Sequence, residues 1–153
     1  MSSEIEAGKA TYQRMVDEVV NQGNFDVVEE LFDPAYVDHS APPGAPGGLD
    51  GVKAVFGMFR TAFPDVKFEI MDMVGEDDIV ATLVHGEGTN TGPFMGIPAS
   101  NLPAKWRSVG FFRIKDGKIV EHWGIPDMLG ILIQIGVIPP PPDVKSARPH
   151  DQE

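Results

Sequence analysis

The chain has 153 residues, of which 42% are hydrophobic, and a formal net charge of −11. This length fits a single domain whose core can enclose a small molecule, and the acidic balance excludes nucleic acid and anionic membranes as partners, because both bind basic surfaces. The absence of cysteine excludes disulfides, thiolate nucleophiles, zinc–thiolate sites and iron–sulfur clusters.

The amino-terminal segment MSSEIEAGK has neither the basic nor the apolar stretch of a signal peptide. No run of about 18 apolar residues, the length needed to span a membrane, occurs in the sequence. We therefore expect a cytoplasmic protein.

Two helices are predicted before residue 35. Apolar residues recur at helical spacing from residue 12 to residue 20, and the polar stretch that ends in Gly23 closes this first helix. Asn24 is a cap for a second, shorter helix, which must end near Pro34 because proline lacks the N–H that a helix interior needs.

A third helix and a sheet follow the Pro- and Gly-rich loop of residues 41–48. The helix begins around Asp50 and stops at Pro64. Alternating apolar residues then predict four strands, joined as an antiparallel meander. These strands cover residues 66–70, 79–88, 106–114 and 119–123.

A short helix over residues 128–135 comes last and is ended by Gly136. The order of elements predicts an α+β fold, with three helices packed on one face of a curved sheet. We assign residues 1–138 to a single domain. Residues 139–153 are rich in proline and polar groups, and we expect this tail to be disordered.

The hairpin between the last two predicted strands has a DG dipeptide at its turn, which favours a two-residue loop. Such a loop pairs Phe112 with Glu121. It puts Glu121 and Trp123 on one face of the sheet, and His122 on the other face as a diagonal neighbour of Arg113. A slip of one residue would exchange the two faces.

The segment GKIVEHWGIPD, residues 117–127, gathers an acid, an imidazole and an indole where a strand leaves the sheet. An apolar surround there can hold a carboxyl pKa near the working pH. Asp127 fits either an acid/base role or a helix cap that accepts from the N–H of Leu129 or Gly130. His122 likewise fits either a proton carrier or a hydrogen-bonded structural histidine.

The four histidines show no HxH or HExxH spacing, so we predict no metal site. Tyr36, Asp38 and His39 follow the second predicted helix, and we place them at the mouth of a pocket. Tyr12 lies on the apolar stripe of the first helix, where packing in the core is the alternative to a role in the pocket.

Four segments of the chain resemble a known family. They are VVNQGNFDVVEELFDPAYVDHS (19–40), FPD (63–65), GPFMGIPAS (92–100) and FFRIKDGKIVEHWGIPDMLGILIQIG (111–136). Together they are similar to the SnoaL-like polyketide cyclases of the nuclear transport factor 2-like (NTF2-like) superfamily, over about residues 5–137. The resemblance implies a cone-shaped NTF2-like barrel with a mainly antiparallel sheet of four or more strands.

The resemblance also implies a reaction, a cofactor-independent intramolecular aldol condensation of a polyketide-like or other carbonyl substrate. Asp127 matches the acid/base carboxylate of the characterised cyclases. Those cyclases place a histidine before the DG turn, where this chain has Arg113, so His122 or His39 would take that role. The resemblance further implies a homo-oligomer, a dimer or tetramer, that associates through its exposed sheet face.

We predict Asp127 and His122 as catalytic residues. In related folds a tyrosine of the first helix donates into the pocket, which makes Tyr12 a candidate oxyanion donor. The predicted substrate-binding residues are Tyr12, Tyr36, His39, Phe59, Phe94, Trp106, Arg113 and Trp123.

Two other functions stay open. One is a non-catalytic ligand-binding or dimerisation module. The other is a hydrolase or isomerase of the same superfamily, of the epoxide hydrolase or ketosteroid isomerase type. Epoxide opening needs two carboxylates around an arginine, and the strand that carries Arg113 lacks the RxD pairing, which favours the cyclase.

Overall fold

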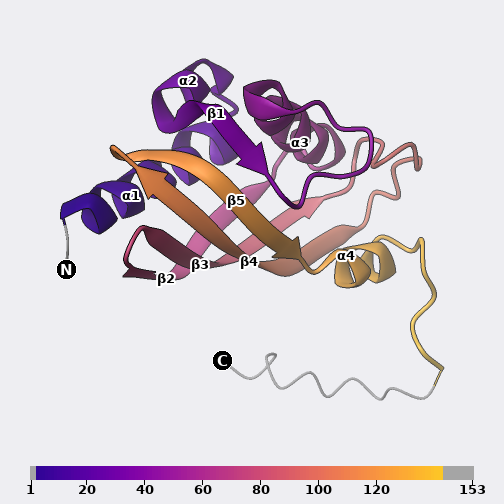
Figure 1. Ribbon diagram of the computed structural model, residues 1–153. Helices are drawn as coiled ribbons and strands as arrows, with labels where there is room; N and C mark the ends of the chain where they lie inside the picture. Colours follow the sequence, from indigo (N-terminus) through magenta and orange to yellow (C-terminus); the bar gives the residue numbers. More distant parts are fainter. Residues whose placement is uncertain (1–2, 143–153) are drawn as a thin grey trace.

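The computed structural model describes residues 3–142, which form a five-stranded mixed sheet with helices over one face (Figure 1). The strands are β1 (Phe32–Asp38), β2 (Lys67–Glu76), β3 (Ile79–Thr89), β4 (Pro103–Lys115) and β5 (Lys118–Pro126). The helices are α1 (Ser3–Arg14), the π-helical η1 (Met15–Asn21), the 3-10 turn η2 (Phe25–Val27), α2 (Val28–Leu31), α3 (Gly48–Ala62) and α4 (Met128–Gln134). The strand order is β1-β5-β4-β3-β2, so the predicted α+β fold is confirmed, with an open sheet rather than a closed barrel.

The first predicted helix is confirmed, and it extends beyond its apolar stripe. α1 continues directly into η1, and the apolar residues of both pack into the core on the sheet. Gly23 then turns the chain with a φ of +71°, a conformation that glycine adopts without steric cost. The buried members of the stripe are Tyr12, Met15, Val16, Val19 and Val20.

The second predicted helix is shorter than expected and is followed by a strand that the sequence did not predict. Asn24 accepts a hydrogen bond from the Asp26 N–H, as a cap, but the helix ends at Leu31 and β1 begins at once. β1 lies at the edge of the sheet, next to β5, and its pairing is irregular around Pro34. An edge strand tolerates proline because one of its sides needs no ladder hydrogen bonds.

The pairing of β4 with β5 corrects the predicted register. Next to the turn the strands pair as expected, but Arg113 then pairs with Glu121 rather than with Val120, because Val120 is the extra residue of a β-bulge. The bulge moves His122 opposite Phe112. His122 therefore lies on the helix-covered inner face.

Glu121 and Trp123 consequently lie on the outer face together with Arg113. The predicted neighbourhood of His122 and Arg113 is wrong, because the two side chains are on opposite sides of the sheet. The prediction that Glu121 and His122 point to opposite faces is confirmed.

The core consists of two clusters. One lies between α1, η1, α2 and the sheet. The other fills the end of the sheet beneath α3 and α4, and it contains Phe63, Phe94 and Trp106. α4 is the predicted last helix, and the chain leaves it at Gly136, whose φ is +82°.

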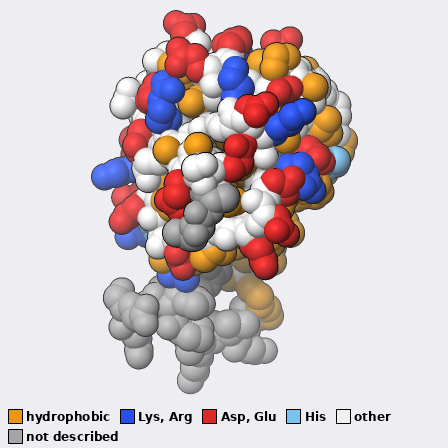
Figure 2. All heavy atoms as spheres, turned by 60° about the vertical axis from the view of Figure 1, so that its left-hand side comes forward, with side chains coloured by type: hydrophobic (Ala, Val, Ile, Leu, Met, Phe, Trp, Pro, Cys, Tyr) orange, Lys and Arg blue, Asp and Glu red, His pale blue; other side chains and the backbone are white. Residues whose placement is uncertain are grey.

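Figure 2 shows acidic side chains spread over the face it presents, with basic side chains between them, as the net charge of −11 leads one to expect. Within residues 3–142 no helix is long and apolar enough to cross a membrane. Most of the predicted tail, residues 143–153, lies outside the described part of the chain.

Candidate active site

A cavity of about 220 Å³ lies between the inner sheet face, the first helix, β1 and α3. Most of its walls are aromatic or aliphatic, and they include Phe32, Phe59 and Phe112. Such apolar pockets with a few placed polar groups are typical of small-molecule sites. The polar side chains of the lining are those of Tyr12, Tyr36, Asp38, Ser40, Thr82, Ser108 and His122.

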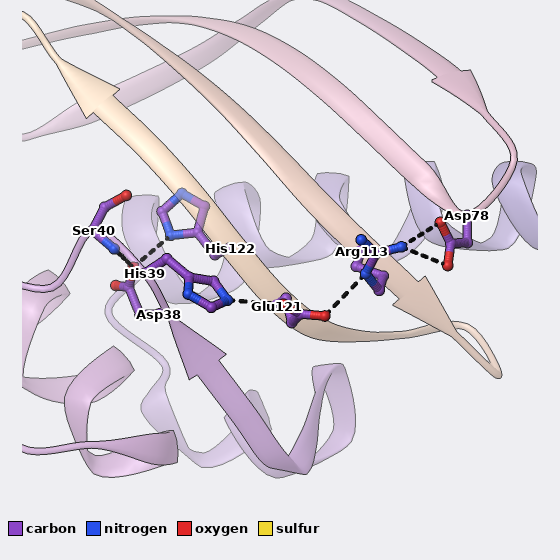
Figure 3. A network of polar contacts seen from close by, with 7 residues as sticks. All are labelled: Asp38, His39, Ser40, Asp78, Arg113, Glu121 and His122. Carbon is purple, nitrogen blue, oxygen red and sulfur yellow. Dashed lines mark hydrogen bonds and ion pairs between the residues drawn. The ribbon is translucent and has the colours of Figure 1, made fainter.

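An Asp–His pair stands in the wall of the cavity. Asp38 on β1 and His122 on β5 are partners in the parallel ladder, and Asp38 Oδ1 lies 3.3 Å from His122 Nδ1 (Figure 3). The same oxygen accepts the Ser40 N–H at 2.8 Å. Both side chains are mostly buried, with 22% of Asp38 and 23% of His122 exposed.

Asp38 is held as a carboxylate by these contacts. Burial raises its pKa, but the hydrogen bonds from His122 and the Ser40 N–H together outweigh burial and leave the pKa below its usual value. Because an ionised carboxylate only accepts hydrogen bonds, the geometry assigns the imidazole proton to Nδ1. Nε2 is then the proton-accepting atom of His122.

The inner wall of the cavity carries a phenol. Tyr12 is 5% exposed, and the Thr82 hydroxyl donates to its oxygen at 3.4 Å. Burial raises the pKa of Tyr12 to about 12, an effect that the Thr82 contact partly offsets. The Tyr12 ring lies 4.6 Å from the Phe112 ring, which in turn stacks on His122 at 4.5 Å. A neutral donor and the imidazole thus flank one aromatic ring.

Tyr36 supplies a second phenol, from β1. Its ring meets Phe32 edge-on at 4.9 Å, and the residue is 5% exposed. Burial and the negative charge of Asp38 both raise its pKa. Its hydroxyl therefore stays protonated over the physiological range and can donate to a ligand oxygen.

Three predicted substrate-binding residues lie on the outer face instead. Two of them, His39 and Arg113, belong to a chain of ion pairs there (Figure 3). His39 Nε2 lies 2.8 Å from Glu121, and Glu121 accepts from Arg113 at 2.9 Å. Arg113 also pairs with Asp78 at 2.7 Å, while His39 stacks on Trp123 with ring centres 4.6 Å apart. His39, Arg113 and Trp123 do not line the cavity.

Asp127 is the amino-terminal cap of α4, which is one of the two roles predicted for it. Its Oδ1 accepts the Gly130 N–H at 2.9 Å, and its own N–H donates to the Arg107 carbonyl at 3.0 Å. The side chain is exposed and stands between Pro126 and Met128, which both line the cavity. Its catalytic role stays a prediction.

The remaining predicted site residues divide between cavity and core. Tyr12, Tyr36, Phe59 and His122 line the cavity. Phe94 and Trp106 are instead buried in the core cluster beneath α3 and α4.

The partner of His122 was not identified from the sequence. Its position after the second predicted helix puts Asp38 at a pocket mouth, but its pairing with His122 depends on β1, a strand without a periodic signal around Pro34.

Comparisons with known proteins agree with this architecture. The sequence profile described as SnoaL-like polyketide cyclase matches residues 10–135. The nogalonic acid methyl ester cyclase of Streptomyces nogalater is 28% identical over 131 residues, which are 84% of this chain and 96% of that one.

Solved structures show the same relationship. IdmH of Streptomyces antibioticus superimposes with a TM-score of 0.73 and 32% identity, covering 85% of this chain and 99% of its own. AclR of Streptomyces galilaeus gives a TM-score of 0.78 and 29% identity, covering 92% of this chain and 87% of its own. From its profile, fold and cavity, the chain belongs to the SnoaL-like polyketide cyclase family.

Proposed function

We propose that this protein catalyses a cofactor-independent, aldol-type ring closure of a polyketide-like or other carbonyl substrate. The observation that carries the proposal is the Asp38–His122 pair in the wall of an apolar cavity. Membership of the family and the likeness to a nogalonic acid methyl ester cyclase support this class of reaction.

His122 acts as the base. Its Nε2 takes a proton from a carbon next to a carbonyl group, and the electron pair of the C–H bond forms an enolate. The imidazole becomes a cation in this step, and the adjacent Asp38 carboxylate stabilises that charge. Burial of the pair strengthens the stabilisation because little water screens it.

The enolate then forms the ring. Tyr12 and Tyr36 donate hydrogen bonds to the enolate oxygen, since both are neutral phenols of the cavity wall. The enolate carbon attacks a second carbonyl of the same molecule and makes the new carbon–carbon bond. The alkoxide that results takes the proton back from His122, so the product is an isomer of the substrate.

Asp127 is the competing acid/base candidate. Its correspondence to the carboxylate of the characterised cyclases supports it, whereas its exposure and its bond to the Gly130 N–H favour a structural role. If the Asp38–His122 pair is the acid/base, replacing Asp38 should slow turnover; if Asp127 is, replacing Asp127 should stop it.

The test uses nogalonic acid methyl ester, the compound in the name of the relative, and ring closure followed by liquid chromatography and mass spectrometry. We expect a product of unchanged mass. Loss of a general base slows such a step by about 10²–10⁴-fold, so we expect His122→Gln to reduce the turnover rate by a factor in this range. Asp38→Asn should reduce the turnover rate as well. Asp127→Asn, checked for folding by circular dichroism, should turn over like wild type.

The opposite pattern, in which Asp127→Asn stops turnover and the other two variants keep it, would transfer the acid/base role to Asp127. A run in water labelled with oxygen-18 separates the hydrolase alternative. A hydrolase leaves the label in its product, while ring closure does not.

We also propose that a second copy of the chain covers the outer sheet face. In a strongly acidic protein, exposed apolar side chains gathered on one sheet face are the mark of an interface. Ile125 is 72% exposed and Phe111 53% exposed. The exposed apolar residues of β2, β4 and β5 are Met71, Val74, Val109, Phe111 and Ile125.

A further inference from the structure

Two glycines face each other across the inner face of β4 and β5. Gly110 and Gly124 are register partners, and both line the cavity. The next pair along the strands is Phe112 with His122, whose rings stack with their planes 14° apart. A bare stretch of backbone therefore adjoins the imidazole.

The imidazole lies over this bare backbone. A Cβ placed on Gly124 would stand 2.6 Å from His122 Cε1 and closer still to Nε2, so the ring occupies the space of the missing side chain. On the opposite strand, a Cβ on Gly110 would stand 2.9 Å from Cε2 of the Phe112 ring. Each ring packs over the glycine two residues away on its own strand, His122 over Gly124 and Phe112 over Gly110.

The backbone itself does not require glycine at residue 124. Gly124 is not among the glycines with a positive φ, and any residue could adopt its extended conformation. Its N–H donates to Ser40 Oγ at 2.7 Å, and an alanine would keep this bond. The one contact that excludes a side chain here is the contact with His122.

We propose that Gly124 is the positioning residue of His122. Because residue 124 has no side chain, the imidazole lies down along β5 with Nδ1 on Asp38 and Nε2 over a residue of the cavity lining. This orientation makes Nε2 the atom that meets the substrate. The catalytic importance of this orientation rests on the proposed function, but the orientation itself can be tested without measuring turnover.

The first test is a double-mutant cycle of Gly124→Ala and His122→Ala, measured by urea unfolding. In the wild-type background we expect Gly124→Ala to raise the unfolding equilibrium constant about tenfold or more, because the new methyl group displaces the ring. In the His122→Ala background the same change should be neutral or stabilising, because alanine restricts the unfolded chain. Equal effects in the two backgrounds, or no effect in either, would overturn the proposal.

The second test reads the orientation directly. Long-range proton–nitrogen NMR at mildly alkaline pH should show the His122 proton on Nδ1 in wild type, with the signal assigned by its loss in His122→Ala. Gly124→Ala should shift the ring toward the other tautomer by breaking the Asp38 contact. Gly86→Ala is the matched control, because its methyl group meets the Trp106 ring instead, in the core cluster beneath α3 and α4, and should leave the tautomer unchanged. An unchanged tautomer in Gly124→Ala contradicts the proposal.

Two outcomes remain informative if Gly124→Ala does not fold. The double variant with His122→Ala should then recover folding, and failure of both would overturn the proposal. The positioning role and the proposed function can be refuted independently of each other. Absence of turnover by wild type with a clear coupling between residues 122 and 124 removes the cyclase assignment alone, whereas turnover with no coupling removes the positioning role alone.

Discussion

Asp38 and His122 are held together by a parallel strand pairing, because β1 adds to the edge of the sheet beside β5 and makes the two residues direct neighbours. The backbone secures this arrangement on the next residue as well, since the His39 N–H donates to the His122 carbonyl at 2.9 Å. The carboxylate and the imidazole therefore share one fixed geometry on the cavity side.

Acid should weaken the fold through Asp38. Its pKa is lowered in the folded state, so its contribution to stability is present above the unfolded pKa of about 3.9 and is lost as the pH falls through the folded value. Urea midpoints of wild type should drop over this acidic range, and those of Asp38→Asn should drop less. Asp26→Asn, an exposed carboxylate on η2, is the control and should follow wild type. Parallel curves for all three proteins would contradict this role.

Alkaline pH should destabilise the fold through the two tyrosines, which are both buried. Burial raises the pKa of Tyr12 to about 12, so its contribution to stability is complete below the unfolded pKa of about 10 and is lost as the pH rises toward 12. Tyrosinate absorbance should therefore rise over the same pH range as unfolding, and circular dichroism measures that unfolding. A gradual rise near pH 10 in the folded protein would show that the phenols are accessible.

The outer ion pairs should have little influence on turnover. Arg113 is 38% exposed and contacts Asp78 and Glu121, away from the cavity, and exposed ion pairs contribute little to stability. Arg113→Ala and Trp123→Ala should keep the turnover of wild type, with only a small shift in urea midpoint. A loss comparable to that of His122→Gln would place the substrate on the outer face.

Self-association should depend on Phe111. A glutamate there puts a charge into an apolar face, which a buried interface cannot accommodate without a partner. Light scattering coupled to size exclusion should give a dimer mass for wild type and a monomer mass for Phe111→Glu. Ala54→Glu, which adds the same charge at an exposed position of α3 on the other side of the sheet, is the matched control and should stay dimeric. A monomeric wild type would remove the proposed interface.

Most of the fold could be predicted from the sequence because periodicity and turn residues are local signals. The helix stripe that ends at Gly23, the DG turn and the stop at Gly136 all agree with the structure. The candidate site could be predicted only in part. A single extra residue, Val120, changes which side of the sheet His122 occupies, and alternation alone does not reveal a bulge.

Asp38 was harder to place for a different reason. A strand that contains Pro34 has no clean alternation, and its partner lies at the other end of the chain. The family resemblance implies a role for Asp127, whose cap was predicted correctly, while the cavity wall combines residues from α1, η1, α3, α4 and all five strands.

The edge position of β1 has a consequence for how the protein matures. β1 and its partner β5 are far apart in the sequence: Ser40, just after β1, and Gly124 of β5 are 84 positions apart. Contacts of such high sequence separation form late, because the entropy of closing a long loop opposes them. We therefore expect the Asp38–His122 pair to be completed late in folding, after the meander of β2 to β5 has placed His122 on the sheet.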